Sequence, residues 1–278
     1  MTADPHDGYA IDELLTVCIA RQVSDGQLVA QGIATPLVTA GYLLAKCTHA
    51  PNLRIASAIG QGVCDTYNGT ALGVASIEAF WLDQMLLTLG FVSAAADVLP
   101  TLHPLEFFRP GQVDARGNFN NIAFGRDYQH PRLRLPGVGG IPDVTITGQR
   151  IHLYVTRHSR VTFVAQCDYV SGLGHDPRRT QGAGPCYLLS DLGQFDWQDG
   201  LLRLTHTHPG VTVEQIRAKT GFPLEIAPQV SETAPPSAEA LHLLRDVIDP
   251  LGVRALEILG GSARRDKLRA ILAAEGAL

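Results

Sequence analysis

The chain has 278 residues, of which 45% are hydrophobic and 18% charged, and its formal net charge is −5. This composition is typical of a globular protein with a sizeable core, and the lack of a clustered basic face argues against nucleic acid or an anionic membrane as a partner. The polar, acidic N-terminus does not resemble a signal peptide, no apolar stretch has the length of a membrane span, and five cysteines without CxxC spacing predict a reduced, cytoplasmic protein.

Helices and strands alternate in the N-terminal part of the sequence. Residues 9–23 carry apolar side chains at the spacing of an amphipathic helix, which Asp25-Gly26 ends. A strand is expected over 28–33. Thr35-Pro36 then begins a helix that reaches about residue 48, with the threonine as N-cap. A second strand over 53–57 completes an order typical of βαβ units and therefore of a parallel sheet.

The remaining elements are mostly strands, followed by C-terminal helices. A helix is expected over 76–89, and the later strands are expected over 107–113, 122–124, 150–155, 160–167, 187–190, 194–197 and 201–205. Gln198-Asp199-Gly200 indicates a hairpin, and Thr212 with Gln215 forms a capping box. The last helices are expected over 237–248 and 263–274. The simplest organisation is one α/β domain over residues 1–278, with an open, mostly parallel sheet flanked by helices, additional β-hairpins and a helical extension over about 260–278.

Two segments have the residue types of a ligand site. Ser57, Ala58 and Gln61 lie where a strand meets a loop, which is the usual site position in open α/β sheets. Gly137, Gly139 and Gly140 form a loop whose backbone N–H groups have no Cβ atoms around them. Such a loop can bind a thioester oxyanion or a phosphate, but it can also be a tight turn between strands.

Each candidate reactive side chain has a structural alternative. Ser57 has no base nearby in sequence, and Cys64 is a possible nucleophile but also an ordinary buried thiol. Asn118 and Asn120 can contact substrate or simply shape a turn. The His206/His208 pair resembles two metal ligands, but no third ligand accompanies it. Glu78 and Asp83 are candidate catalytic carboxylates, but such charged residues usually lie on the solvent-exposed face of a helix.

Several segments in order resemble the B (β) subunit of class I CoA-transferases of the glutaconate type. The first is Thr48–Gly60, which is similar to the active-site segment of that family. The match continues through residues 111–120, 130–132, 135–140, 167–172, 190–195, 208–211, 220–222 and 248–250, and it covers roughly residues 9–258. In that family a glutamate that attacks acyl-CoA thioesters stands seven residues after an Ala-Pro pair, and this chain has Ala58 there.

The resemblance implies a subunit without the transfer nucleophile. Two relatives also lack that glutamate: the β subunit of steroid ring-opening acyl-CoA hydrolases, which the run 170–176 resembles, and the β subunit of a glutaconyl-CoA-type decarboxylase, which has cysteine at the position of Ala58. The implied enzyme is an α2β2 heteromer acting on a coenzyme A thioester, with no bound cofactor or metal. Its pocket in this chain is expected to include Ser57, Ala58, Gln61, Asn118, Gly137, Gly139 and Gly140.

In this reading the α subunit supplies the catalytic carboxylate, and the reaction is hydrolytic C–C cleavage or decarboxylation. Two alternatives stay open. A carboxylate from elsewhere can replace the missing glutamate and support true CoA transfer, or the chain can be a non-catalytic scaffold.

Overall fold

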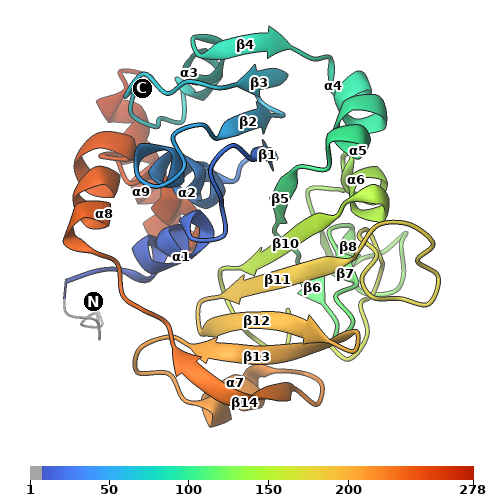
Figure 1. Cartoon of the computed structure of the whole chain (residues 1–278). Coiled ribbons are helices and arrows are strands. Elements are labelled where there is room, and N and C mark those ends of the chain that lie inside the picture. The colour runs from blue at the N-terminus through green and yellow to red at the C-terminus, as the bar shows by residue number, and fades with distance from the viewer. Residues whose placement is uncertain (1–7) are drawn as a thin grey trace. The chain divides into compact units, whose positions relative to one another are not determined.

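The computed structural model describes residues 8–278, which form two compact units. The terminal unit consists of the chain up to Ala94 together with Pro235–Leu278, and the central unit consists of Ala95–Ala234. Figure 1 shows the terminal unit in blue to teal and in red, and the central unit in green to orange. The expectation of a single domain over residues 1–278 stays a prediction.

The strands of the terminal unit follow the order β1-β2-β3-β4. They are β1 (Leu28–Gln31), β2 (Arg54–Ser57), β3 (Gly62–Cys64) and β4 (Met85–Thr88). β1 and β2 are parallel, whereas β2–β3 and β3–β4 are antiparallel. The helices are α1 (Ile11–Ala20), α2 (Pro36–Cys47), α3 (Ile77–Leu82), α4 (Phe91–Ser93), α8 (Ala238–His242) and α9 (Gly261–Ala274), with helical turns at η2 (Leu243–Ile248) and η3 (Val253–Glu257).

The close packing of α1 against α2 depends on Gly41. A methyl group added at Gly41 would lie 2.6 Å from Ile19 Cγ2 of α1, so the two helices approach too closely for any side chain there. Both helices are buried along most of their length, including Asp12 and Glu13 of α1. The apolar periodicity of residues 9–23 thus marks a helix that packs inside the terminal unit.

Arg254 neutralises the buried acids of α1. Its guanidinium lies 2.9 Å from Asp12, 3.1 Å from Glu13 and 2.9 Å from Asp249. Asp249 also accepts hydrogen bonds from the backbone N–H groups of Val253 and Arg254. This cluster connects the C-terminal part of the unit to its first helix. It also gives Asp249 a structural role, because its carboxylate holds the turn that follows it.

Two expectations for the terminal unit are corrected. Thr35 precedes α2 as expected, but its hydroxyl donates to Gly32 O, and the N–H of Leu37 instead donates to the Glu257 carboxylate at 2.9 Å. The expected helix over 76–89 ends at Leu82, and β4 follows it. Residues 85–87 are all apolar and therefore have no helical period of their own, so pairing with β3 decides their conformation. The strands at 28–31 and 54–57 and the helix over 263–274 are confirmed.

In the central unit the strand order is β14-β13-β12-β11-β10-β5. The strands are β5 (Leu105–Phe108), β10 (Arg150–Val155), β11 (Pro185–Ser190), β12 (Gly193–Gln198), β13 (Leu201–Thr207) and β14 (Glu225–Glu232). β10 is parallel to β5 and β11, β13 is parallel to β14, and β12 is antiparallel to both of its neighbours. Short hairpins join β6 (Gln112–Val113) to β7 (Phe119–Asn120) and β8 (Ala123–Phe124) to β9 (Leu133–Arg134). The helices are η1 (Ala94–Val98, at the unit boundary), α5 (Leu99–Leu102), α6 (Ile141–Thr147) and α7 (Val213–Lys219).

Most strands expected in this unit are confirmed, with two corrections. The hairpin at Asp199-Gly200 is present, and so are both hydrogen bonds of the capping box of α7. The strand expected over 107–113 is broken at Pro110-Gly111, because proline has no N–H for the ladder. The strand expected over 160–167 is wrong: only Phe163 forms a bridge, with Val113. The segment forms a turn in which Phe163 packs into the core while Val161 stays exposed.

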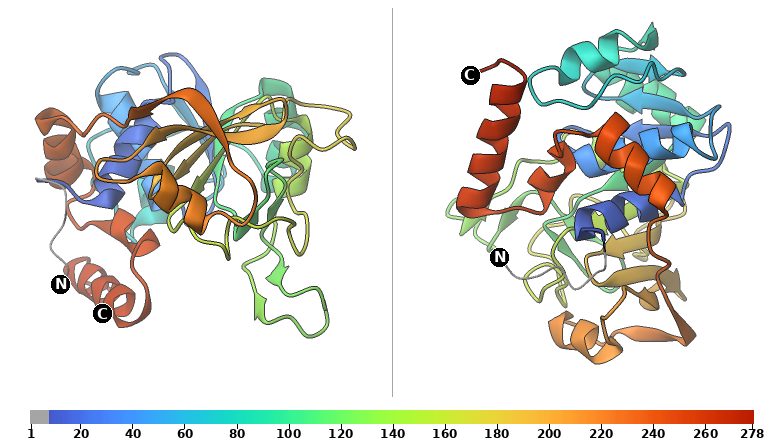
Figure 2. Two further views of the ribbon diagram at one scale, coloured as in Figure 1. Left: turned by 90° about the horizontal axis from the view of Figure 1, so that it is seen from below. Right: turned by 90° about the vertical axis from the view of Figure 1, so that its left-hand side faces the viewer.

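The α/β fold with flanking helices and extra hairpins is confirmed, and its sheet pairing is mixed, with parallel and antiparallel pairs in each unit. Figure 2 shows the β8–β9 hairpin, in light green, projecting from the rest of the central unit. Over residues 8–278, no helix combines the length and apolarity needed to cross a membrane.

Candidate active site

Ala58 begins the turn that joins β2 to β3. Its backbone N–H donates to Gln31 O of β1 at 2.9 Å, and the carbonyl of Gln61 at the end of the turn accepts from Leu89 N at 2.6 Å. Gln61 adopts a left-handed conformation with φ +51°, which is uncommon for a residue with a side chain. The turn is therefore held on both sides, and the methyl group of Ala58 has no ionisable atom to offer a substrate.

The Ala-Pro segment before β2 is fixed by a buried lysine. Lys46 Nζ donates to Pro51 O at 2.9 Å and to Leu53 O at 2.7 Å, and Ala50 N donates to Ala45 O at 2.8 Å. The segment that resembles the family pattern thus sets the start of β2 and, through this short strand, the position of Ala58.

Ser57 is engaged in positioning this turn. Its hydroxyl donates to Gln31 Oε1 at 3.1 Å and accepts from Gly60 N at 3.2 Å, and the residue is only 4% exposed. Gln31 Nε2 in turn donates to Thr35 Oγ1 at 3.0 Å. No base contacts Ser57 among the described residues, so its hydroxyl shapes the turn and is not activated as a nucleophile.

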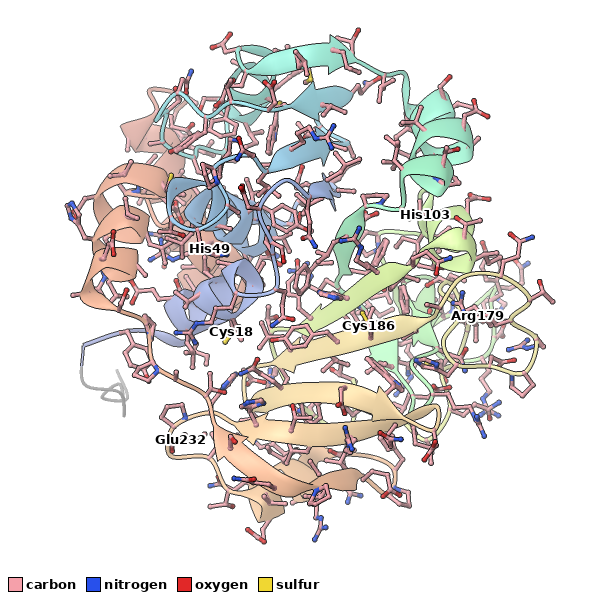
Figure 3. The ribbon with its side chains drawn as sticks, in the orientation of Figure 1. Cys18, His49, His103, Arg179, Cys186 and Glu232 are labelled. Carbon is pink, nitrogen blue, oxygen red and sulfur yellow. The ribbon has the colours of Figure 1, made fainter. Side chains whose placement is uncertain are left out.

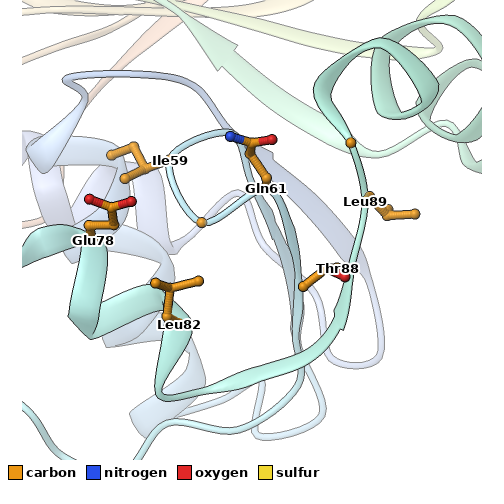
Figure 4. A pocket seen from close by; sticks show the side chains of 8 residues that line it. Ile59, Gln61, Glu78, Leu82, Thr88 and Leu89 are labelled. Carbon is orange, nitrogen blue, oxygen red and sulfur yellow. The ribbon is translucent and has the colours of Figure 1, made fainter.

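A cavity of about 270 Å³ lies beside this turn within the terminal unit. Figure 4 shows the side chains around it, which come from the β2–β3 turn, α3 and the end of β4. They belong to Ile59, Gly60, Gln61, Glu78, Leu82, Thr88, Leu89 and Gly90. Of the residues expected in the pocket, Gln61 lines this cavity. Glu78, considered as a carboxylate from the sequence, lines it as well, whereas Asp83 does not.

Gly60 is required by the packing of the turn. A methyl group at this position would lie 2.5 Å from Met85 Cε and 2.7 Å from Trp81 Cβ. The turn therefore rests directly on α3 and β4, and the wall of the cavity cannot shift without disturbing them.

Cys64 is an inert thiol in this structure. It is 2% exposed, its Sγ lies 3.7 Å from the Trp81 carbonyl oxygen, and burial raises the pKa of the thiol to about 11. A nucleophilic cysteine needs an accessible thiolate. The structure therefore supports the structural alternative for Cys64, that of a small buried apolar residue.

In the central unit, the glycine-rich loop presents open backbone just before α6. Gly137 has φ +109° and Gly139 has φ +49°, and a methyl group at either position would meet no atom within 4 Å. The Gly137 N–H donates to Asn121 O at 3.2 Å. Within the described part of the chain, the N–H groups of Gly139 and Gly140 have no hydrogen-bond acceptor, so they are available to an oxyanion.

Arg179 anchors the segment that follows this loop. Its guanidinium donates to the carbonyls of Thr145 and Ile146 at the end of α6, at 3.0 and 3.1 Å, and to Gly174 O at 2.9 Å. Figure 3 shows Arg179 in the long loop between β10 and β11. The arginine thus satisfies the last carbonyls of a short helix and fixes the position of the glycine-rich loop at its other end.

Asn118 is held by the turn that contains it. Its side-chain nitrogen donates to Asp114 Oδ2 at 3.0 Å, and its side-chain oxygen accepts from Gly174 N at 2.9 Å. Asn120 is fully buried and bonded to Gln112 Oε1 and Ala123 O. These contacts support the structural alternative for both asparagines.

Of the His206/His208 pair, His208 is likewise structural. Both ring nitrogens of His208 are hydrogen-bonded, to Thr233 Oγ1 at 2.9 Å and to Ser190 O at 2.8 Å, and the ring is buried. Over residues 8–278 no group of metal-binding side chains is found.

Glu106 is a carboxyl group that the sequence pattern did not single out. It lies on β5, and its Oε2 atom is buried without a hydrogen-bond partner in the described chain. Burial raises the pKa of this carboxyl to about 8. The signal in the sequence is one acid within the apolar run of β5, which is unusual because an unpaired buried carboxylate is costly.

Comparison with known proteins identifies the family. No protein-family model matches the chain. It is 30% identical over 260 residues to the β subunit of the 3-oxoadipate CoA-transferase of Pseudomonas knackmussii, a match that spans 85% of this chain and 92% of the relative. The chain belongs to the class I CoA-transferase superfamily.

Other relatives in this superfamily have different activities. The chain is 30% identical to the IpdB subunit of the cholesterol ring-cleaving hydrolase of Rhodococcus jostii, over 84% of this chain and 89% of the relative. Its structure matches that of the decarboxylase AibA/AibB with a TM-score of 0.76 and 29% identity, over 90% of this chain and 98% of that one. The family resemblance seen in the sequence is confirmed, and at the same level of identity it includes a transferase, a hydrolase and a decarboxylase.

Proposed function

We propose that this chain is the β subunit of a heteromeric enzyme that hydrolyses or decarboxylates an acyl-CoA, with the catalytic carboxylate supplied by an α subunit. The observation that carries the proposal is the β2–β3 turn. Alanine stands at the position of the family glutamate, and the neighbouring Ser57 and Cys64 are both engaged or buried. The relatives named as hydrolase and decarboxylase support a reaction without a transfer nucleophile in this subunit.

Both proposed reactions avoid a covalent intermediate on Ala58. CoA transfer through the family glutamate requires an acyl anhydride, which alanine cannot form. In decarboxylation the C–C bond to CO₂ breaks and its electron pair moves into the thioester as an enolate. In hydrolytic cleavage a base activates water, which adds to a ring carbonyl, and the electron pair of the broken C–C bond again moves into the thioester. Each reaction needs donors to the thioester oxygen and a general base.

This chain is proposed to shape the acyl pocket and to donate to the thioester oxygen. In the terminal unit Ser57, Ala58 and Gln61 form or support the pocket wall. In the central unit the open N–H groups of Gly139 and Gly140 are the proposed oxyanion donors. Coenzyme A enters as part of the substrate. An α2β2 assembly in the cytoplasm is proposed with this function, and the free cysteines of the chain are consistent with that compartment.

True CoA transfer is the second candidate, and Glu78 is the observation that favours it. Its carboxylate lines the cavity beside the Ala58 turn and can in principle act as a nucleophile in place of the missing glutamate. A scaffold without catalytic function is disfavoured by the open glycine-rich loop, since a scaffold has no use for unsatisfied backbone donors.

The test is co-expression with a candidate α-type subunit, followed by assay on a panel of acyl-CoAs. The proposal predicts loss of CO₂ or ring cleavage, with no borohydride-trappable glutamyl-CoA on this chain. Exchange of CoA between carboxylic acids, with an adduct on Glu78 that Glu78→Gln abolishes, would establish the transferase instead.

A further inference from the structure

The C-terminal helix α9 ends in a turn that fixes the position of Glu275. Gly276 has φ +68° and its N–H donates to Ala273 O at 3.1 Å, while the N–H of Ala277 donates to Leu272 O at 2.9 Å. These bonds form a Schellman motif, in which Glu275 is the C-cap residue. A carboxylate is disfavoured at this end of a helix, because it lies near the negative end of the helix dipole. Local preference therefore does not explain Glu275.

The Glu275 carboxylate is hydrogen-bonded to a loop far away in the sequence, residues 73–76. The backbone N–H groups of Val74 and Ala75 donate to its Oε2 atom, both at 3.0 Å. The N–H and the hydroxyl of Ser76 donate to its Oε1 atom, at 3.2 and 2.6 Å. Burial opposes ionisation, but these hydrogen bonds outweigh it and lower the pKa of the Glu275 carboxyl group. Figure 2 shows the end of α9, in red, beside this loop, in teal.

Gly73 gives the carboxylate room in the loop. A methyl group added at Gly73 would collide with Glu275 Oε1 and with Ser76 Oγ. The backbone of Gly73 does not have a positive φ, so the side chain is excluded by this contact and not by strain. The loop is therefore shaped around the carboxylate of Glu275.

The loop leads directly into α3, which forms one wall of the cavity beside the Ala58 turn. Glu78 and Leu82 of this helix line the cavity, and the turn at Gly60 rests on Trp81. A helix of six residues is too short to be stable by itself. Its position therefore depends on its packing and on the loop that precedes it. Whatever holds the loop also helps to hold the wall of the cavity.

The anchor of this loop belongs to the helical extension over 260–278, which follows the segments that resemble the family. Most of α9 is exposed, and its buried residue is Ile271, one turn before Glu275. On the other side of the loop, Leu72 is buried and its N–H donates to Ile248 O at 2.8 Å. The part of the loop between Leu72 and α3 is thus held by Glu275.

We propose that Glu275 is a positioning residue of the acyl pocket. From the C-terminal extension it holds the loop of residues 73–76, and through this loop it keeps α3 and its cavity-lining side chains in place. This inference rests on the proposed function, because it takes the cavity beside Ala58 as part of the acyl pocket. It gives the extension a role in binding the acyl group, although Glu275 itself touches no substrate.

Hydrogen exchange of the full-length chain tests whether Glu275 holds α3. Glu275→Ala removes both acceptor oxygens and should raise the exchange rate of residues 74–82 about fivefold or more, whereas Glu275→Gln keeps one acceptor oxygen and should raise it less. Exchange in α2 is the internal reference and should not change, because the release is local. Asp266→Asn, which removes an exposed carboxylate of the same helix, is the matched control. Gly73→Ala breaks the same contact from the loop, so its effect should not add to that of Glu275→Ala.

Kinetics of the enzyme assembled with the α-type subunit test whether the position of α3 matters to the acyl group. Glu275→Ala should raise KM for the acyl-CoA about threefold or more, with a smaller change in kcat, because a displaced wall weakens binding more than chemistry. The inhibition constant of free coenzyme A, which has no acyl group, should stay at the wild-type value. A merely structural role would not separate these two constants. Asp266→Asn should match the wild type in both.

The outcomes separate this inference from the proposed function. If folded Glu275→Ala exchanges like the wild type over residues 74–82, Glu275 does not hold α3 and the inference is overturned, although the proposed function stands. If exchange rises but KM stays the same, or the inhibition constant of coenzyme A rises in parallel with KM, Glu275 supports only the fold and the inference is again overturned. If the assembled wild type converts no acyl-CoA, the proposed function fails and this inference fails with it.

Discussion

Mild acid should destabilise the central unit through His158, a buried and neutral histidine. Its ring stacks on Phe163 with centroids 3.6 Å apart, and its nitrogens are hydrogen-bonded to Ser190 Oγ at 3.1 Å and Thr220 Oγ1 at 3.0 Å. Burial lowers the pKa of His158 from 6.5 to about 3, because the imidazolium would lose its hydration there. The unfolded chain therefore takes up a proton at a pH where the folded chain does not.

The magnitude follows from the difference in pKa between the two states. Above pH 6.5 the ring is neutral in both states, so it adds no pH dependence; as the pH falls from 6.5 toward 3, stability is lost. One pH unit corresponds to about 1.4 kcal/mol, so His158 should lower the free energy of unfolding by about 2 kcal/mol at a pH of about 5. Buried acids such as Glu106, whose pKa is raised to about 8, act in the opposite direction.

The assay isolates His158 by comparing two proteins. Urea unfolding is measured at about pH 7.5 and about pH 5 for the parent and for His158→Gln. Both carry Trp81→Phe, which leaves Trp197 of the central unit as the fluorescent reporter. His158→Gln should be less stable at neutral pH but should lose about 2 kcal/mol less on acidification. Exposed His130→Gln should follow the parent. Equal losses in His158→Gln and the parent would refute the reasoning.

Three further predictions concern residues placed by the structure. Gly60→Ala should lower the free energy of unfolding, measured by urea titration, by about 1–3 kcal/mol, because the added methyl group would overlap Met85 and Trp81. The control is Gly90→Ala, which should change this free energy little because the space around Gly90 is open. Arg254→Met should lower the free energy of unfolding by about 3–5 kcal/mol, because it leaves buried carboxylates without their cation. Arg254→Lys keeps a positive charge and should lower it less. Equal stability of the Met and Lys variants would contradict an electrostatic role. Gly139→Ala should lower kcat of the assembled enzyme by about tenfold or more, through obstruction of an open N–H. Gly137→Ala, whose N–H is already bonded to Asn121 O, is the control for backbone strain and should lower kcat less.

Local signals in the sequence predict the elements that form by themselves. The apolar stripe of α1, Pro36 at the start of α2 and the capping box of α7 all act within one or two turns of chain, and these helices are present. The errors occur where a distant segment decides the conformation. Residues 85–88 are a strand because β3 pairs with them, and the chain around Phe163 is a turn that a single bridge joins to Val113. Neither partner can be identified from the apolar pattern alone.

The candidate site follows the same division. The position of Ala58 at the end of β2 and the open conformation of the glycine-rich loop agree with what the sequence predicts. The sequence could not show that the Asn118 side chain is hydrogen-bonded to Asp114 and Gly174, or that α3 places Glu78 beside the cavity next to Ala58. These facts depend on contacts between segments that lie far apart in the chain.

The central claim is that this subunit carries no transfer nucleophile of its own. It is tested most directly by the mass of this chain after the assembled enzyme reacts with acyl-CoA and borohydride. The wild-type chain should keep its unmodified mass, whereas in Ala58→Glu borohydride should reduce the glutamyl-CoA thioester to an alcohol, which releases CoA and lowers the mass of the chain. The same loss of mass on the wild-type chain, from reduction of Glu78 or of any other carboxyl group, would contradict the account.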